Sequence, residues 1–397
     1  MGCLKKSLKV ISIVVGILVC FYIFMLALAF GVHPVAFVAL VFLVLFFRAL
    51  FLNKPKHLKI IYLSLTLLCS VWAFHRDITN LYYSCFATVK DGDSVDLSLY
   101  VPFKEGTKAA TLDKTSTLRF SKEDDLPKMD GATALYPLYA AFAQAVYPKG
   151  DYSLLGGRSM DGGYRWWSSE DDIVFCTTTI GAYSNIIDGS ADIIFVAGPS
   201  EKQLKNAKKE GVELKFTPIG KEAFVFFVNS KNKVDSLTTE QIQNIYTKDV
   251  RNWSQVGGNF SSIRPFQRPE DSGSQTRMIK FMGDKRLAHP LTHEVVRPMS
   301  GVIELTSNYR NHGNAIGYSF LFFATEMVEN DKIKLISVDG VKPTRENVKN
   351  GTYPYASEFF AVTRKDNENP NVDKLIKWIL SPEGQELVEK TGYTPVK

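Results

Sequence analysis

The sequence predicts an α/β fold of two lobes that follows three membrane-spanning helices. Strand-like and helix-like segments alternate after about residue 129, which is typical of α/β proteins with largely parallel sheets. Three long apolar stretches come before residue 76, and a chain of 397 residues suits two or three folding units. We expect a membrane anchor over 1–76, a linker with the first strand over 77–128, one lobe from 129–228 with 325–397, and a second lobe over 229–324.

Each apolar stretch has about the length of a helix that crosses the hydrocarbon core of a bilayer. The three are Val10–Phe30, Val35–Leu52 and Leu58–Phe74. The first exceeds the apolar region of a signal peptide, and no small-residue cleavage site follows, so we expect a retained multi-pass anchor in the cell membrane. Basic residues precede the first stretch and lie between the second and third, which predicts a cytoplasmic N-terminus and an extracytoplasmic soluble domain. If one stretch were interfacial instead, this orientation would be reversed.

Charge and cysteine content exclude some functions. The net charge of +6 is small, and no basic block with interleaved aromatic residues indicates a nucleic-acid partner. No Cys or His spacing indicates a metal site, and we expect no cofactor. Cys85 and Cys176 could pair in an oxidising compartment, but two buried free thiols are favoured because a domain this large needs no disulfide.

The elements of the first lobe follow from hydrophobic patterning and helix-start signals. The apolar stretches Ala191–Val196 and Ala223–Val228 are expected to be strands buried on both faces. Pro137 suits the first turn of a helix over Ala134–Val146. The other expected elements are weak strands at Ser94–Val101 and Thr117–Phe120, strands at Ile173–Phe175 and Leu214–Pro218, and helices at Gly181–Ile187 and Ser200–Glu210.

A second unit is expected to begin near Asn229. Thr238 with Gln241 three residues later fits a capping box, which predicts a helix to about Tyr246. The remaining segments include Ile316–Tyr318, which is expected to lead back to the first lobe. The others are a strand at Ile263–Phe266, a helix at Gln275–Met282, and the returning segments Lys332–Ser337, Phe359–Thr363 and Val372–Leu380.

Three hydroxyl-bearing turns are each expected to open a helix, where unpaired backbone N–H groups and the helix dipole attract anions. The most informative is Arg268–Thr276, because Arg268 can form a bidentate pair with a tetrahedral oxyanion. Gly273 allows close approach of the backbone to a ligand. The other two turns are Asp130–Thr133 and Cys176–Gly181. Each turn alone could be an ordinary helix cap, but together they could converge on one anion.

From about Asp130 to the C-terminus the chain resembles the phosphate-binding proteins of ABC-type phosphate uptake, which are PstS-like members of the type II periplasmic-binding-protein-like superfamily. Further segments that carry the resemblance are Phe195–Ser200, the stretch that begins at Val234, and the Asn252-Trp-Ser stretch. The resemblance implies two α/β lobes with a cleft and a hinge. It also implies a ligand-binding set of Gly131, Ala132, Thr133, Thr179, Arg268, Ser272, Gly273 and Ser274.

One position departs from the family pattern. The resemblance places Ala197 where the family has an Asp that accepts a hydrogen bond from the protonated phosphate. Such a carboxylate distinguishes hydrogen phosphate from sulfate, which has no proton to donate. Here either a nearby carboxylate such as Asp130 or Asp271 substitutes, or anion selectivity is looser.

The predicted function is a membrane-anchored, extracytoplasmic solute-binding protein for phosphate or a related oxyanion, and not an enzyme. Its expected partners are the lipid bilayer and an ABC permease or a membrane sensor. Two alternatives from other classes remain open at this stage. One is a phosphate-ester hydrolase that uses the same cleft, which would require an activated nucleophile or a metal cluster. The other is a structural or adhesive surface domain with a vestigial cleft.

Overall fold

The computed structural model describes residues 41–46, 48–49, 55–84, 95–152, 173–290, 295–296, 302–303, 306, 313–328 and 330–396, with the backbone alone for 72–84. The chain forms two compact units, Met1–Ala87 and Thr88–Lys397.

The described part of the first unit is mainly one helix, α3 (Lys56–Ser84). This helix contains the third expected span, Leu58–Phe74. The first expected span and most of the second lie outside the described residues. Across the described ranges, no helix combines the length and apolar character that a membrane crossing requires. The expected three-span anchor is therefore not confirmed.

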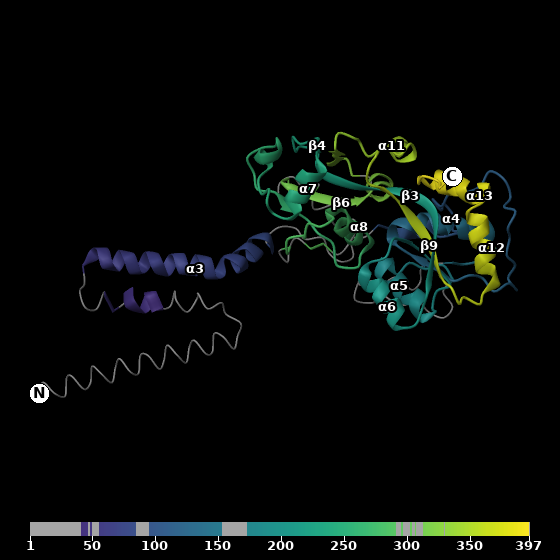
Figure 1. The fold of residues 1–397 in the computed structure, drawn as a ribbon, viewed down its shortest axis with the longest axis horizontal. Coiled ribbons are helices and arrows are strands. Elements are labelled where there is room, and N and C mark those ends of the chain that lie inside the picture. The colour runs from purple at the N-terminus through teal and green to yellow at the C-terminus, as the bar shows by residue number, and fades with distance from the viewer. Residues whose placement is uncertain are drawn as a thin grey trace, which may run out of the picture. The chain divides into compact units, whose positions relative to one another are not determined.

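The second unit is built on a seven-stranded sheet whose main path runs β1-β2-β9-β3-β6-β5, with β7 also paired to β3 (Figure 1). The sheet is mixed rather than largely parallel as expected. Parallel pairs join β1 to β2 and β5 to β6, whereas β3 and β9 run antiparallel to their neighbours. The strands are β1 (Met129–Gly131), β2 (Ile193–Ala197), β3 (Leu214–Asn229), β5 (Arg264–Pro265), β6 (Ala315–Phe320), β7 (Ile333–Leu335) and β9 (Ala356–Arg364).

The long strand β3 connects the two lobes. Its first part, up to Ala223, pairs with β9, and its second part, from Phe224, pairs with β6 and β7. The two strands expected in this region are therefore one strand, with a register shift between Pro218 and Gly220. A strand can change partners along its length because the backbone N–H and C=O groups of each residue pair independently with whichever strand lies beside them.

We propose that the return to the first lobe occurs at β9 rather than at the predicted boundary of residue 325. Strand β6 pairs with β3 and β5 and does not lead back. The buried residues Ile336 and Val348 also belong to the core that surrounds the second half of β3. We therefore define lobe 1 as residues 88–223 with 356–397, and lobe 2 as residues 224–355.

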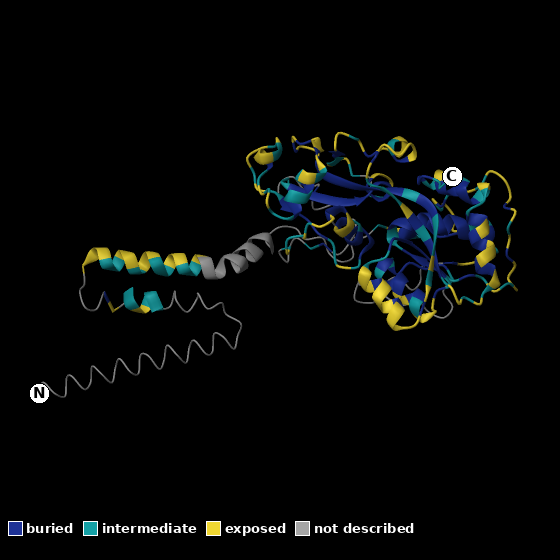
Figure 2. Ribbon diagram, viewed as in Figure 1, coloured by how far each residue is buried: buried dark blue, intermediate teal, exposed yellow. Residues whose placement is uncertain are grey.

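Helices cover both faces of the sheet in lobe 1, which explains the uninterrupted apolar sequence of β2. Phe195 packs in a core with α4, α12 and α13, whereas Ile194 and Val196 pack in another with α5. All five residues of β2 are buried, and Figure 2 likewise draws most of the second half of β3 as buried. The helices of lobe 1 are α4 (Tyr136–Val146), α5 (Thr178–Asp188), α6 (Glu201–Lys209), α12 (Pro370–Ile379) and α13 (Pro382–Thr391).

Lobe 2 has its own aromatic core around β3. Phe224, Phe226 and Tyr318 contact one another there, and Phe281 of α8 packs on the two phenylalanines. As expected, Thr238 caps α7 in a capping box with Gln241. The remaining elements of this lobe are α7 (Thr239–Tyr246), α8 (Gly273–Met282), α11 (Arg345–Lys349), the short turns η3 (Trp253–Val256) and η5 (Phe323–Met327), and the pair β4 (Ser236–Leu237) and β8 (Ser337–Val338).

The described part of the predicted linker, residues 95–128, is an ordered segment packed on lobe 1. Neither weak strand expected in it is present, and a short turn, η1 (Leu97–Tyr100), lies where the first was expected. Leu97 and Phe120 are buried in the core of lobe 1. The carboxylate of Glu383 also accepts hydrogen bonds from the Thr117 backbone N–H at 3.0 Å and its hydroxyl at 2.8 Å. The sequence did not indicate this packing, because the few apolar residues of the segment, such as Leu97 and Phe120, follow no helical or strand periodicity.

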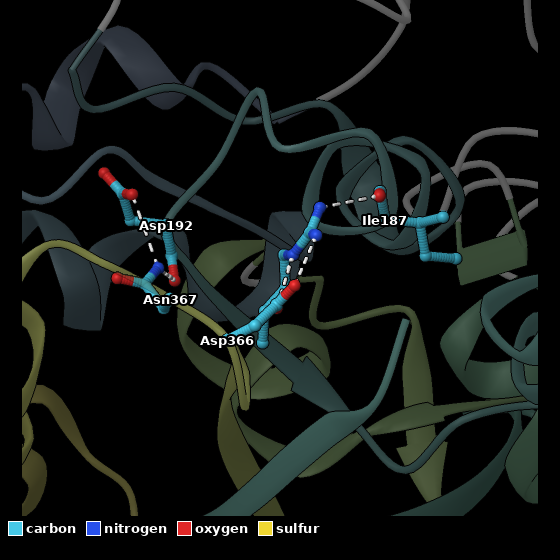
Figure 3. A network of polar contacts seen from close by, with 5 residues as sticks. Ile187, Asp192, Asp366 and Asn367 are labelled. Atoms are coloured by element: carbon cyan, nitrogen blue, oxygen red, sulfur yellow. Dashed lines mark hydrogen bonds and ion pairs between the residues drawn. The ribbon is translucent and has the colours of Figure 1, made fainter. Parts of the chain in front are cut away.

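A polar network joins the end of β9 to the C-terminal end of α5 (Figure 3). The Arg364 guanidinium donates to the Ile187 carbonyl at 3.1 Å and forms a bidentate pair with Asp366, with both distances 2.9 Å. Asn367 donates to the Asp192 carbonyl at 3.2 Å. A cation at a helix C-terminus satisfies free carbonyls and complements the helix dipole. The network therefore fixes α5, whose other end enters the site described below.

We expect Arg364→Ala to lower the free energy of unfolding by about 1 kcal/mol, because it removes one charge-assisted hydrogen bond to a helix end. The exposed pair with Asp366 adds little. Urea unfolding measures the change. Asp366→Asn is the matched control, since it leaves the contact with Ile187 in place, and an equal loss in both variants would contradict the assignment.

Candidate functional site

Asp130, the middle residue of β1, holds the first two predicted turns together in lobe 1. One carboxylate oxygen accepts the backbone N–H groups of Gly131 at 2.7 Å and Thr177 at 2.8 Å. The other accepts the Thr177 hydroxyl at 2.5 Å and the Asn185 side-chain amide at 2.8 Å. Asp130 is completely buried. Burial raises the pKa of this carboxyl to about 6, and the four donors oppose that rise.

Cys176 provides a second link between the same two turns. Its thiol donates to the Gly131 carbonyl at 3.4 Å and lies within hydrogen-bond reach of the Thr133 hydroxyl. Cys176 is a buried free thiol, and burial raises its pKa to about 11, so the thiol stays protonated. Cys85, its possible disulfide partner, lies outside the described residues.

Gly131 has a packing role in the first turn. A Cβ atom at this position would lie 2.6 Å from the Phe195 carbonyl oxygen and 2.7 Å from the Tyr139 ring. Only glycine therefore allows β1 to approach β2 so closely. Ala132 and Thr133 follow at the surface, where both are partly exposed and the Ala132 N–H donates to the Phe195 carbonyl at 2.9 Å.

The third turn begins α8 in lobe 2. The Ser272 hydroxyl caps the helix by accepting the Gln275 N–H at 3.3 Å. Ser274 is 3% exposed and Thr179 is 7% exposed, and neither hydroxyl has a hydrogen-bond partner among the described residues. Buried hydroxyls normally have such partners, so these two groups remain available to a ligand.

The start of α8 meets the start of α5 across the two lobes. A Cβ atom on Gly273 would lie 3.1 Å from the Thr179 hydroxyl oxygen and 3.9 Å from the Ala197 methyl group. The two helix beginnings, where backbone N–H groups lack intrahelical partners, therefore lie close together, with little space for a side chain at Gly273. With the links through Asp130 and Cys176, all three predicted turns lie in one continuous region of the molecule.

Thr178, the first residue of α5, is held in an unfavourable backbone conformation. Its φ of 68° lies in the left-handed region, which is rare for a β-branched residue. Such strain persists only where the surroundings fix the conformation, and it is concentrated at functional sites. The backbone conformation of Thr178 therefore supports a functional role for the turn Cys176–Gly181. The sequence of the turn alone could not show this conformation.

Arg268 follows β5 and is positioned from two directions. Its backbone N–H donates to the Gln275 side chain and to the Tyr318 hydroxyl, both at 3.0 Å. Its guanidinium donates to the Val296 carbonyl at 2.7 Å. Its direct contact with an anion remains a prediction.

A set of contacts absent from the predicted site joins the lobes beside these turns. The Asp271 carboxylate of lobe 2 accepts the Ser200 hydroxyl at 2.7 Å and pairs with Lys202 at 2.9 Å. The Gln203 side chain donates to the Asp271 carbonyl at 3.1 Å. We call Asp271, Ser200, Lys202 and Gln203 the lobe clasp. The sequence predicted a helix that starts at Ser200, but nothing local indicated that Asp271, 71 residues away, would contact that start.

The fold agrees with the family assignment. Residues 177–383 match the family described as PBP superfamily domain, which is more than half of the chain. The chain belongs to this family. As in other PBP-like proteins, its α/β elements form two lobes.

Among curated relatives, this chain is similar to the phosphate-binding protein PstS of Borreliella burgdorferi. The two are 28% identical over 222 residues, which cover 53% of this chain and 76% of the relative. It is also 23% identical to the phosphate-binding protein PstS of Pseudomonas aeruginosa over 66% of this chain and 88% of the relative. A crystal structure of a putative phosphate ABC transporter substrate-binding protein with bound phosphate from Clostridium perfringens shares the fold. Its TM-score is 0.52 at 23% identity, and the match covers 68% of this chain and 99% of that one.

Proposed function

We propose that this protein is an extracytoplasmic solute-binding protein that holds inorganic phosphate, or a closely related oxyanion, between its two lobes. The observation that carries the proposal is the contact between Thr179 and Gly273, which brings two helix beginnings from different lobes together. Helix beginnings attract tetrahedral anions through backbone N–H groups and the helix dipole. The relatives named phosphate-binding protein support this choice of ligand.

Each predicted site residue has a role in this proposal. The Thr179, Ser272 and Ser274 hydroxyls and the Thr133 side chain donate hydrogen bonds, and the Arg268 guanidinium supplies positive charge. Gly131 and Gly273 have no side-chain atoms that would block the anion, and Ala132, whose N–H already donates to the Phe195 carbonyl, adds only a small methyl group. Asp130 is a positioning residue, because it fixes two of the turns without facing the anion. Closing the lobes excludes water and strengthens each charge-assisted contact.

Calorimetric titration of the full chain with phosphate tests the proposal. Saturable binding should be seen, and Thr179→Ala should weaken it about tenfold, the effect of one hydrogen bond to a charged ligand. Thr352→Ala, at an exposed position of lobe 2, is the matched control and should leave affinity unchanged. No binding at millimolar phosphate would refute the function. Release of chromophore from a phosphate ester would favour the hydrolase alternative, and the absence of any small ligand would favour the adhesive one.

The lobe clasp should stabilise the closed form. We expect Asp271→Gly to raise the dissociation constant for phosphate about tenfold, chiefly through faster release, because the carboxylate contacts with Ser200 and Lys202 are lost. Glycine is used because Asp271 has a φ of 65°, which alanine would resist. Asp271→Asn keeps an acceptor for Ser200 and should cost less affinity. Stopped-flow measurements give the rate of phosphate release. Equal release rates in the wild-type protein and the two variants would contradict a role of the lobe clasp in closure.

Delivery of the anion to an ABC permease, or to a membrane sensor, forms part of this proposal and follows from the family resemblance. Attachment to a bilayer is a separate proposal that rests on the apolar sequence of residues 1–76. Within the described part of α3, Ile60 and Leu67 are 63% and 67% exposed. Alkaline carbonate extraction of membranes tests this attachment. Recovery of the chain in the soluble fraction would reject it.

A further inference from the structure

Two basic side chains, Arg277 and Lys280, extend along α8 from the proposed site. They follow Gly273 at spacings of four and seven residues, so all three lie on one face of the helix. Both ends of this face contact lobe 1. Gly273 lies against Thr179 and Ala197, and the Lys280 ammonium lies 3.0 Å from the position of a Cβ atom on Gly198. Arg277 therefore lies between them on the helix face that meets lobe 1.

These two cations have no counter-charge within the described ranges. Neither forms an ion pair or hydrogen bond with a described residue. Burial lowers the pKa of Arg277, and burial together with the Arg277 charge lowers the pKa of Lys280. Arg277 is half-buried, whereas Lys280 stays at the exposed rim. A partly desolvated cation without a partner is unfavourable, and an anionic ligand would relieve that cost.

Asp130 and Asp271, the two carboxylates considered above as acceptors of a ligand proton, both accept hydrogen bonds from other protein groups. Asp130 accepts four hydrogen bonds from its own lobe. Asp271 accepts a hydrogen bond from Ser200 and forms an ion pair with Lys202 in the lobe clasp. At the end of β2, Ala197 presents only a methyl group toward Gly273. Apart from these two carboxylates and the exposed Glu270, the described groups around the two helix beginnings are hydrogen-bond donors, apolar groups and cations.

We propose that Arg277 and Lys280 belong to the oxyanion site, and that this site selects its ligand by charge and tetrahedral shape rather than by the ligand's proton. It therefore binds sulfate as well as hydrogen phosphate. This inference rests on the proposed function of the same site. A protonated oxyanion gains an advantage over an unprotonated one only where an acceptor receives its proton. A site of donors and cations gives two dianions of similar size similar affinities.

Competition between phosphate and sulfate on the full chain at about pH 7.5 tests the inference, since phosphate is then mostly a dianion. We expect the two dissociation constants to agree within about 30-fold. A larger preference for phosphate would overturn the inference while leaving the proposed function intact. If neither anion binds, the proposed function itself fails.

Variants separate the contributions of charge and of the missing acceptor. Arg277→Gln should weaken both anions about tenfold and Lys280→Gln should weaken both by a smaller factor, with thermal unfolding unchanged. Lys205→Gln, on the exposed face of α6, is the matched charge control. Ala197→Asp should reduce sulfate affinity at least tenfold more than phosphate affinity, because a carboxylate repels the anion that cannot donate. Unchanged affinities in Arg277→Gln, or an unchanged ratio in Ala197→Asp, would refute the assignment.

Discussion

Replacing Glu222 by glutamine should stabilise the protein above about pH 5, by a margin that grows to about 4 kcal/mol near pH 8. Glu222 lies on β3 just before that strand changes partners between the lobes, and it is 8% exposed. One carboxyl oxygen accepts the Ala223 N–H at 2.9 Å, and the other is buried without a hydrogen-bond partner among the described residues. Burial raises the pKa of this group to about 8, although nearby N–H groups and the Arg345 charge oppose the rise.

The sign of the effect follows from proton binding. Below the ordinary pKa of 4.5 the carboxyl is protonated in both states and does not affect stability through charge. Between that value and about 8 the unfolded chain loses the proton while the folded protein keeps it, so stability falls as pH rises. Above about pH 8 both states are ionised and the loss is complete. Glutamine resembles the neutral carboxyl at every pH and avoids this loss.

Urea midpoints of wild-type and Glu222→Gln protein, compared across this pH range, measure the difference. Asp130, with its pKa raised to about 6, contributes a decline of the same sign in both proteins and therefore cancels. Glu358→Gln makes the same charge change at an exposed position of β9 and should show no growing difference. Parallel stability curves for wild type and Glu222→Gln would show that Glu222 ionises normally in the folded protein.

Elements with a strong local signal were predicted well. The capping boxes at Ser200 and Thr238 begin the expected helices, and the apolar run Ala191–Val196 becomes the buried strand β2. The errors come from long-range pairing. Nothing local indicates that β3 continues through Gly220, because the partner that holds this stretch extended is β9, more than a hundred residues later. For the same reason, nothing local indicates that Ile336 and Val348 pack in the core around the second half of β3.

The candidate site shows the same division. Helix beginnings with hydroxyl-bearing residues can be recognised from sequence, and Thr179 and Gly273 do meet. Whether a nearby carboxylate is available could not be predicted, because Asp130 and Asp271 are close to the turns in sequence and only tertiary contacts show their partners. Arg277 was overlooked because a basic residue inside an amphipathic helix usually indicates a solvated face.

Replacing Gly273 by valine should weaken phosphate binding about 30-fold while leaving the stability of each lobe nearly unchanged. A Cβ atom at this position would lie 3.1 Å from the Thr179 hydroxyl oxygen, which is tighter than ordinary contact, and the valine methyl groups would extend farther. Forcing such an overlap costs about 2 kcal/mol, which corresponds to that factor in affinity. The cost arises only when the lobes are together, since in open lobes the methyl groups face solvent.

A double-mutant cycle distinguishes this steric effect from a general weakening of the helix beginning. Thr179→Ala removes both side-chain atoms that the new Cβ would meet. Adding Gly273→Val to Thr179→Ala should therefore cost much less affinity than adding it to the wild-type protein. Isothermal titration gives the affinities, and small-angle scattering with saturating phosphate reports whether each variant still closes. If Gly273→Val costs the same affinity in both backgrounds, the two helix beginnings do not meet around the bound anion, and the binding site lies elsewhere.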